Sequence, residues 1–576
     1  MDVSKYKGYL MKFSVEELKQ YLGQNLVDML IEWSVEPEPL FTKSRLADMI
    51  VTIYGINRLS DKEFRRSFLS RLAEDDLLSF REFLPSKFKA SPANELIPEI
   101  IKASWARNAI SQRLLEILDI AEDVFPYAGA EEQTIDTITA PDRFYELFDY
   151  QYVIKQQVLN HLTSGSSLNK MLVHMPTGTG KTKTAMHTIV HHFIFNMRKR
   201  GLVIWMAHTT ELLQQALETF TNVWRHIGDG DANTYKLWGS FELEDISESL
   251  DGFMFCGFVK LMSIAKSKPE TFSRLVNDCR LLVIDEAHKA AAPETKKIIS
   301  DIMVKKSEMR DRALIGLTAT PGRNAANAVD IGRLVTMFDG KLIDVNTDTL
   351  NRINFTEFKV QNTLPERDTI KFFQERQILA RLRRERLSYS EGLNEVELQK
   401  LKGTAVSNGY DDKDFSRVFL ETVGRNRNRN IAIMNKLIQL NREQIPAIVF
   451  ACSVEHGKIL SAALILEGID NACVFGDMNP LARATAIRRF KDRGDGLNVL
   501  INYEVLTTGF DATNIKCVFI TRPTQSIVLY SQMIGRGLRG PMMGGNTECL
   551  LVDIEDNLSK YNESMAYNYF SNYWTN

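Results

Sequence analysis

Ten short apolar segments, in two groups of five, constrain the fold more than any other feature of this chain. The first group, within residues 145–345, alternates with helical segments and consists of KMLVHM, GLVIWMA, GFMFCGF, RLLVIDEA and RALIGLTAT. The second group, within residues 430–555, consists of AIVFAC, ACVFGD, NVLINY, CVFITR and CLLVDI. Parallel sheets have this layout and bind ligands beyond the ends of their strands. We therefore expect an α/β fold with two tandem parallel-sheet lobes, at residues 140–345 and 431–555.

Three other parts of the chain carry different patterns. Residues 1–135 show helical apolar spacing without strand-like alternation, which predicts an all-helical N-terminal domain. Residues 346–430 look helical and polar, so we expect a helical linker or insertion between or beside the lobes. Residues 556–576 contain enough aromatic side chains to dock on the body of the protein.

The charge of the chain gives no general argument for a polyanionic partner. Its net charge is −2, and residues 1–140 contain 17 Lys and Arg against 23 Asp and Glu. An acidic domain is a poor candidate for binding phosphates. We expect the N-terminal domain to bind a companion protein instead, and any nucleic-acid site to be local.

Cysteine usage and hydropathy bear on the location of the protein. The six cysteines are scattered and form no CxxC pair, so we expect reduced core thiols and not a metal site. The sequence contains no secretion signal and no apolar stretch of membrane-spanning length. We expect a cytoplasmic protein without a membrane partner.

The string MPTGTGKT follows the first apolar segment and has the composition of a phosphate-binding loop. Gly178 and Gly180 let backbone N–H groups close around phosphate oxygens at the start of a helix. Lys181 adds a positive charge, and Thr182 offers a hydroxyl to Mg²⁺. Met175 stands where the strict pattern has glycine, so the string alone also fits a glycine turn that caps a helix.

Two further motifs stand at strand ends in the first lobe. In DEAH, Asp285 is expected to hold Mg²⁺ and Glu286 to orient or deprotonate the attacking water. The alternative for two adjacent acids is a solvated turn. In GLTATP, the hydroxyls of Thr318 and Thr320 can hydrogen-bond the segment that contains His288 and so report the state of the nucleotide.

The second lobe supplies two motifs of its own. In QMIGRGLRG, Arg536 and Arg539 lie three residues apart on one helical face and can reach a γ-phosphate across a cleft. The alternative, a solvated basic helix end, is disfavoured by Gly535 and Gly537. The string LTTGFD suits a loop between nucleotide and polymer, through Thr507, Thr508, Gly509 and Asp511.

In their order and spacing these motifs resemble those of superfamily 2 DEAD/DEAH-box helicases and translocases, over residues 145–555. The run VLTTGFDATNIKCVFITRPTQSIVLYSQMIGRGLRG looks especially like RadD-type helicases and the motor subunits of type I restriction enzymes. The resemblance implies two RecA-like lobes, ATP and Mg²⁺ as cofactors, and nucleic acid as partner, with DNA favoured over RNA.

The resemblance also implies roles for individual residues. Tyr150 and Gln151 would lie near adenine, and Gln532 would complete the site from the second lobe with the two arginines. The other nucleotide contacts implied are Thr177, Gly178, Thr179, Gly180, Lys181, Thr182, Gly509 and Asp511. The nucleic-acid track implied runs past His208, Thr209, Phe258, Ser453, Gly476 and Thr507.

Two basic stretches between the lobes could extend this track. The first contains Arg376, Arg381, Arg383, Arg384 and Arg386, and the second contains Arg425, Arg427 and Arg429. A solvated helix face is an equal alternative for each of them.

Two hypotheses about function follow. The first is an ATP-dependent translocase or helicase that acts on DNA, in genome maintenance or antiphage defence. The second is a nucleotide-gated nucleic-acid clamp or recruitment module that does not separate strands.

Overall fold

The computed structural model describes most of the 576-residue chain. The described residues are 3–33, 41–120, 135–139, 145–164, 168–243, 249–303, 312–320, 328–345, 369–389, 414–478, 480–492, 497–507, 512–524 and 526–554. The predicted docking of residues 556–576 lies outside them, as do Thr508, Gly509 and Asp511.

The first lobe is an eight-stranded sheet in the order β1-β4-β5-β3-β6-β7-β2-β8. In that order the strands are Ile135–Thr139, Asp231–Leu237, Gly252–Gly257, Leu202–Ala207, Cys279–Asp285, Arg312–Thr318, Leu168–His174 and Leu342–Asp344. Only the pairing of β1 with β4 is antiparallel among the described strands. All five predicted strands of this lobe are present, which confirms the parallel sheet.

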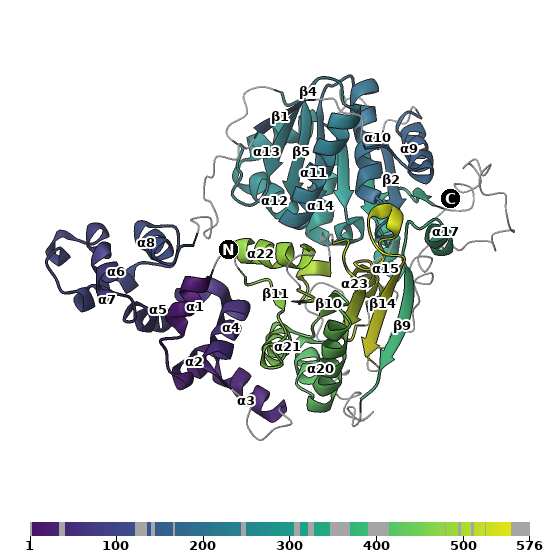
Figure 1. The fold of residues 1–576 in the computed structure, drawn as a ribbon. Coiled ribbons are helices and arrows are strands. Elements are labelled where there is room, and N and C mark those ends of the chain that lie inside the picture. Colours follow the sequence, from purple (N-terminus) through teal and green to yellow (C-terminus); the bar gives the residue numbers. More distant parts are fainter. Residues whose placement is uncertain are drawn as a thin grey trace.

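Helices cover both faces of this sheet (Figure 1). On one face, α9, α10 and α11 pack on alternate strand residues such as Trp205 and Val283. On the other, α12, α13, α14 and α15 pack on the intervening residues such as Ile204 and Leu282. These helices are Asp149–Leu162, Lys181–Phe195, Thr210–Ile227, Phe258–Ser267, Pro269–Asp278, Pro293–Met303 and Ala328–Met337. Burial on both faces explains why these strands are continuously apolar.

The second lobe is a six-stranded sheet in the order β11-β12-β10-β13-β14-β9, and all of its pairings are parallel. In that order the strands are Ala472–Val474, Val499–Asn502, Ala447–Phe450, Cys517–Ile520, Glu548–Ile554 and Arg381–Leu387. Its helices α19 to α23 are Arg417–Gly424, Arg427–Arg442, Val454–Leu466, Pro480–Lys491 and Ile527–Ile534. The five strands expected from the sequence are again present.

Strand β9 corrects the helical prediction for the first basic stretch. Arg381–Leu387 pairs in parallel with β14 along its whole length, and forms the edge of the second sheet. Leu382 packs on the apolar core, while the Lys436 ammonium binds the Glu385 carboxylate at 2.7 Å. Charged side chains are common on edge strands because one side of the strand faces water. The segment RLRRERL is therefore a strand that its polar sequence does not predict.

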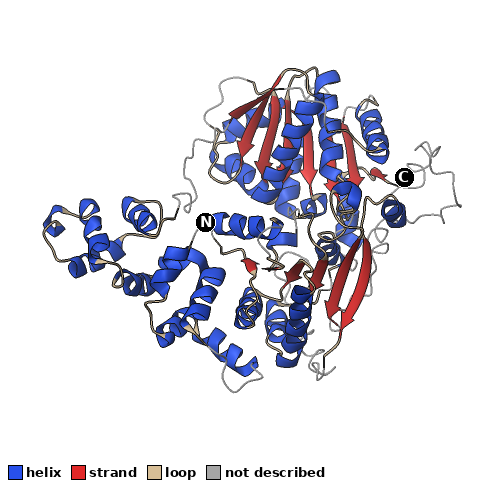
Figure 2. Ribbon diagram, in the orientation of Figure 1, coloured by secondary structure: helices blue, strands red, loops and turns tan. Residues whose placement is uncertain are grey.

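The described part of residues 1–120 contains helices and no strands, shown in blue at the left of Figure 2. Helices α1 to α8 are Ser4–Leu10, Val15–Leu22, Gln24–Trp33, Lys43–Tyr54, Lys62–Leu69, Glu74–Leu78, Ala93–Lys102 and Ala109–Ile117. Helix α2 begins with a capping box, in which Ser14 and Glu17 satisfy each other's backbone N–H groups. Short 3₁₀ helices occur at Gly55–Ser60, Ser79–Phe83, Ser86–Phe88, Ala287–Ala291, Val505–Thr507 and Pro541–Met543.

The N-terminal helices dock on the second lobe. Helices α3 and α4 contact α20 and α21, and the apolar residues of both parts form one cluster. Polar contacts add to it, since the Arg427 Nε donates to the Glu32 carbonyl oxygen at 2.7 Å. The Lys458 ammonium lies 5.1 Å from the centre of the Tyr54 ring. Helices α5 to α8 extend away from the two lobes (Figure 1).

Two sequence-based expectations bear on the core and on membranes. All six cysteines are described, all are buried, and none forms a disulfide, in agreement with the prediction of core thiols. Among the described helices, none combines the length and hydropathy that crossing a membrane requires.

Candidate functional site

The phosphate-loop string turns between β2 and the N-terminus of α10. Gly178 and Gly180 have φ angles of +89° and +79°, in the left-handed region that favours glycine. The Thr179 hydroxyl donates to the Pro176 carbonyl oxygen at 2.8 Å and closes the turn. The backbone N–H groups at the start of the 15-residue helix α10 point into this turn, which is the geometry of an anion site.

Tyr150 and Gln151 hydrogen-bond to the backbone of this loop. The Tyr150 hydroxyl and the Gln151 Nε2 both donate to the Thr179 carbonyl oxygen, at 2.7 and 2.9 Å. A Cβ added at Gly180 would collide with the Gln151 amide. Both side chains are fully buried. The structure thus places them against the phosphate loop, and their predicted contact with adenine stays a prediction.

Lys181 lies between the two acids of DEAH. Its Nζ is 3.2 Å from Glu286 Oε1 and 3.6 Å from Asp285 Oδ1. Burial alone would lower the pKa of Lys181, but the two carboxylates raise it above its usual value. For Glu286, burial opposes ionisation, yet the Lys181 ammonium lowers its pKa. Burial raises the pKa of Asp285. A charged lysine and a charged Glu286 therefore face each other at the loop.

The backbone at Glu286 is strained. Its φ angle is +49°, which is uncommon for any residue other than glycine. Such a conformation costs about 1 to 3 kcal/mol and persists only where the surroundings impose it. The strained turn directs the Glu286 carboxylate toward Lys181, at the end of β6.

His288 connects the ends of β6 and β7. Its Nδ1 lies 3.1 Å from Thr318 Oγ1 and 3.3 Å from Glu286 Oε2. The Thr318 hydroxyl already donates to the Thr320 carbonyl oxygen at 2.7 Å, so the tautomer with its hydrogen on Nδ1 satisfies these contacts. Burial lowers the pKa of His288 to about 3, and the imidazole is neutral. The predicted coupling residues thus form one chain of hydrogen bonds, and their role in coupling stays a prediction.

The motif QMIGRGLRG of the second lobe packs directly on the phosphate loop of the first. A Cβ added at Gly535 would lie 2.6 Å from Thr177 Cγ2, and one at Gly178 would lie 3.8 Å from Arg539 Cγ. The Ala380 N–H donates to the Leu538 carbonyl oxygen at 2.8 Å, which fixes the backbone beside Arg539. Both predicted arginines, Arg536 and Arg539, are partly buried at this contact.

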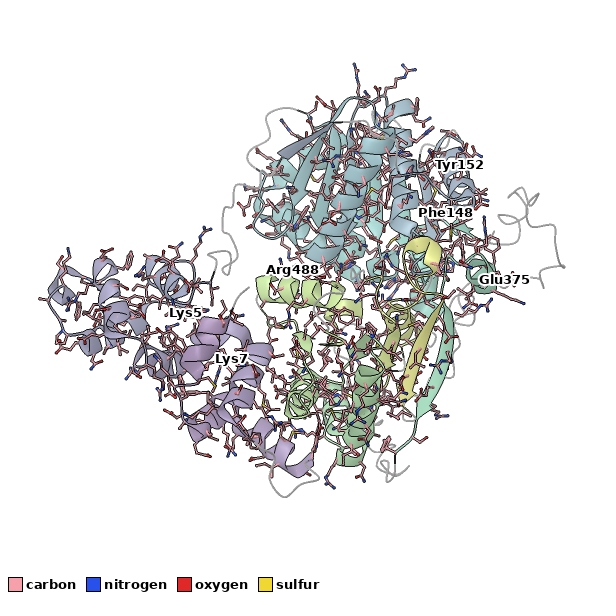
Figure 3. The ribbon with its side chains drawn as sticks, viewed as in Figure 1. Lys5, Lys7, Phe148, Tyr152, Glu375 and Arg488 are labelled. Atoms are coloured by element: carbon pink, nitrogen blue, oxygen red, sulfur yellow. The ribbon has the colours of Figure 1, made fainter. Side chains whose placement is uncertain are left out.

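Arg376 pairs with an acid of the first lobe, and its suggested place on a phosphate-binding edge stays a prediction. Its guanidinium binds both carboxylate oxygens of Asp149, each at 2.7 Å. The same connection brings helix α17, Thr369–Glu375, onto α9, where the Phe373 and Tyr150 rings meet edge to face at 4.9 Å. Figure 3 shows Phe148 and Glu375, which flank this contact, on the same side of the molecule. No local sequence pattern predicts this pair, because its members are 227 residues apart.

Two arginines of the second basic stretch make contacts within the protein. The Arg429 side chain is 1% exposed, and its guanidinium donates to the Thr521 carbonyl oxygen. Arg427 binds the N-terminal domain through the Glu32 carbonyl oxygen. The suggested phosphate contact of Arg429 is therefore wrong, because a guanidinium buried inside the second lobe cannot reach a polymer.

A cavity of about 780 Å³ lies between the lobes beside this site. It is lined by five residues of the predicted nucleic-acid track: His208, Thr209, Phe258, Gly476 and Thr507. The DEAH residue His288 and the second-lobe residue Gln532 line it as well, so the cavity adjoins the nucleotide site. In the described part of the chain, His288 Nε2 and Gln532 Nε2 are buried without a hydrogen-bond partner.

Three predicted track residues lie elsewhere. Ser453 caps helix α21, where its hydroxyl accepts from the His456 N–H at 3.1 Å. Arg383 and Arg384 lie on the edge strand β9, where Arg383 binds the Glu548 carboxylate at 3.2 Å. None of the three lines the cavity.

Sequence reasoning missed two arginines that do line it, Arg483 and Arg522. Arg522 comes two residues after strand β13, near a strand end like the motif residues already identified. Its position near the end of a strand is the sequence signal that could have identified it. Arg483, on α22, had no comparable signal.

Comparison with known proteins agrees with this geometry. Residues 144–323 match the family described as "Type III restriction enzyme, res subunit", and residues 429–540 match "Helicase conserved C-terminal domain". The "Putative mitochondrial ATP-dependent helicase irc3" of Schizosaccharomyces pombe is 26% identical over 72% of this chain and 58% of its own length. The "Type I restriction enzyme EcoKI endonuclease subunit" of Escherichia coli is 24% identical over 64% of this chain and 31% of its own length.

The same likeness extends to solved structures. That of Saccharomyces cerevisiae Dbp5 bound to RNA and ADP BeF3 has a TM-score of 0.45 at 14% identity, over 72% of this chain and 86% of the other. The chain spans 58% and 31% of the lengths of the two curated relatives named above. Its two matched domains contain the phosphate loop and DEAH in one, and the arginine motif in the other. The chain belongs to superfamily 2 of the helicases and translocases.

Proposed function

We propose that this chain is an ATP-dependent nucleic-acid translocase or helicase that acts on DNA. The observation that carries the proposal is the contact of the arginine motif around Gly535 with the phosphate loop at Thr177. A nucleotide held there touches both lobes, so its hydrolysis can change the position of one lobe relative to the other. The cavity between the lobes adjoins this contact and offers the polymer a place to bind.

The described residues fit ATP with Mg²⁺. The left-handed glycines and the N-terminus of α10 form a cradle for phosphate oxygens, and the charged Lys181 lies beside it. The Thr182 hydroxyl and the Asp285 carboxylate are the proposed ligands of Mg²⁺. Bound ATP supplies a phosphoanhydride bond whose hydrolysis releases free energy.

The proposed roles of the protein in hydrolysis are positioning and charge stabilisation. Glu286 orients the attacking water and accepts its proton, and the displacement of its Lys181 partner by phosphate frees the carboxylate for that role. Arg536 and Arg539 stabilise charge on the transferring phosphate, and Gln532 lies on the cavity side of the same motif. His288, Thr318 and Thr320 pass the state of the site to the end of β7.

DNA is the proposed polymer because the family matched by residues 144–323 and the EcoKI subunit are named for restriction enzymes, which act on DNA. Genome maintenance or antiphage defence is the proposed setting. Helices α5 to α8 extend from the body and are the proposed contact for a companion protein. The cytoplasmic location stays a prediction. The proposed domains are residues 1–135, 140–345, 346–430, 431–555 and 556–576, with strand β9 of residues 346–430 completing the sheet of the second lobe.

The decisive test is an ATPase assay with single- and double-stranded DNA and RNA, beside a strand-displacement assay. We expect DNA to stimulate hydrolysis and Lys181→Ala to abolish it. If about five phosphates are neutralised, the logarithm of DNA affinity should fall with that of salt concentration at a slope of about −4. Stimulated hydrolysis without strand separation or movement would favour a nucleotide-gated clamp. Hydrolysis in Lys181→Ala equal to that of the wild type would refute the assigned ATP site.

A further inference from the structure

Both arginines of the interlobe cavity are held by carboxylates that line the same cavity. Arg483 binds Glu211 Oε1 at 2.7 Å. Arg522 binds Glu504 Oε1 at 2.7 Å with one nitrogen and Asp414 Oδ2 at 3.0 Å with another. A polymer that enters the cavity therefore meets guanidiniums whose charge is already compensated.

The two ion pairs bring together different parts of the chain. Glu211 is in the first turn of α11 in the first lobe, and Arg483 is on α22 in the second lobe, so their pair spans the cavity. Arg488, also on α22, is labelled in Figure 3 and marks this helix at the side of the second lobe nearest the first. Asp414 precedes α19, in the segment between the lobes. Releasing these pairs would free the lobes as well as the arginines.

Burial makes the Arg522 pair stronger than a surface contact. The side chains of Arg522 and Asp414 are 9% and 12% exposed. Burial alone would lower the pKa of Arg522, but Asp414 and Glu504 raise it. The Thr524 hydroxyl donates to the second oxygen of Asp414 at 3.1 Å, so this carboxylate is held on both sides. Attraction between charges increases where water is excluded.

The backbone of Glu504 is also held in an unusual conformation. Its φ angle is +60°, in the left-handed region, although it is not glycine. The Thr507 hydroxyl, on the cavity lining, donates to the Glu504 carbonyl oxygen at 2.7 Å and supports the turn. A strained residue at a binding cavity indicates that its position is imposed by the structure around it.

We propose that Glu211, Asp414 and Glu504 form a carboxylate lock on the nucleic-acid track. These three acids occupy the guanidiniums of Arg483 and Arg522 in the free protein, and the polymer binds by exchanging its phosphates for their carboxylates. The inference rests on the proposed function. It adds that the polymer-binding site contains acids that compete with the polymer's phosphates for the two arginines. The lock favours polymers with closely spaced phosphates, because a single phosphate cannot replace three carboxylates at once.

Amide variants test the lock, since Gln and Asn keep the shape of the acids but not their charge. Binding of a fluorescently labelled single-stranded DNA is measured by anisotropy across a salt series. For Glu211→Gln and Asp414→Asn we expect affinity to increase by roughly 3- to 10-fold, as for release of one charge pair. The salt slope should become steeper by about 0.7 in Glu211→Gln, which frees Arg483. In Asp414→Asn, Arg522 keeps its contact with Glu504.

The control is Glu294→Gln, which removes the same charge from the same cavity. Within the described residues Glu294 makes no ion pair, so its loss releases no arginine. A second variant, Glu211→Gln with Arg483→Ala, should lose the gain in affinity of Glu211→Gln alone. Thermal unfolding of each variant checks that the fold is retained, and Glu211 is exposed enough that its variant should fold.

The possible results separate the lock from the proposed function. Tighter binding in Glu211→Gln and Asp414→Asn than in Glu294→Gln supports the lock. Equal affinities in these three variants, with DNA still bound by the wild type, overturn the lock and leave the translocase proposal standing. Absence of DNA binding in the wild type and in every variant overturns both.

Discussion

Gly535 of the second lobe lies in van der Waals contact range of Thr177 in the phosphate loop of the first. A Cβ at Gly535 would come within 2.6 Å of Thr177 Cγ2, closer than two carbon atoms approach in folded proteins. The lobes therefore meet at the nucleotide site through a glycine backbone. Their separation at this point is set by the absence of a side chain.

Gly535→Ala should hold the lobes apart and slow hydrolysis. We expect kcat to fall by roughly 10²-fold, as for a displacement of about 1 Å at a reacting centre. Nucleotide binding to the first lobe should persist because its loop is unchanged. Steady-state ATPase assays and titration with a fluorescent nucleotide measure the two effects. The matched control is Gly332→Ala, at an exposed helical position where a Cβ meets nothing within 4 Å; equal kcat in both variants would contradict the contact.

Glu286→Gln should bind ATP and fail to turn it over. The amide keeps the shape of the side chain but cannot accept a proton, and loss of a general base typically costs about 10²- to 10⁴-fold in rate. Single-turnover hydrolysis and nucleotide titration measure the two steps separately. Glu294→Gln serves as a control of equal charge change outside the nucleotide site. Turnover equal to the wild type would remove Glu286 from the mechanism.

Arg539→Ala should reduce hydrolysis more than it reduces nucleotide affinity. Arginines that stabilise a transferring phosphate contribute about 10³- to 10⁵-fold in rate. Arg383→Ala is the control, because Arg383 lies exposed on β9 and pairs only with an exposed glutamate in the described contacts. Comparison of kcat for the two variants checks the assignment. A similar kcat for both would exclude Arg539 from the reaction.

The Asp149 to Arg376 pair should stabilise the docking of α17 and leave DNA binding unaffected. The two side chains are 39% and 21% exposed, so we expect a coupling free energy of about 0.5 to 1 kcal/mol. A double-mutant cycle with Asp149→Asn and Arg376→Gln, measured by urea unfolding, gives this energy. A flatter salt slope for DNA binding in Arg376→Gln would instead restore this arginine to the nucleic-acid track.

His456 should make the second lobe sensitive to acid. Its Nδ1 accepts from the Cys452 N–H at 3.1 Å. Burial, and to a smaller extent the Arg429 charge, keeps the pKa of His456 well below its usual value. The unfolded chain takes up a proton below about pH 6.5 that the folded protein excludes. Stability should therefore fall as pH decreases from there, at a slope approaching about 1.4 kcal/mol per pH unit for this group. Urea unfolding at about pH 7.5 and about pH 5.5 should show a smaller loss in His456→Gln than in the wild type; equal losses would exclude His456 as the cause.

The predicted strands illustrate what local sequence can reveal. Segments such as RLLVIDEA and AIVFAC are recognisable because a parallel strand covered on both faces must be apolar throughout. Strand β9 escapes this rule, since its edge position exposes most of its side chains. Strands β1, β4 and β8 were also missed. The two outer strands of the first sheet, β1 and β8, lie at its edges, where the apolar requirement is weaker.

Local sequence accounts for the chemistry of the individual motifs. The phosphate loop, DEAH and the paired arginines consist of residues near each other in the chain, so their backbone geometry follows from short-range rules such as the left-handed conformation of Gly180. Tertiary structure alone decided which arginines face the cavity. Arg429 is buried, Arg376 binds Asp149, and Arg483 meets Glu211 across 272 residues of sequence. Identical guanidiniums acquire different roles because packing, which depends on the whole chain, selects the partner of each.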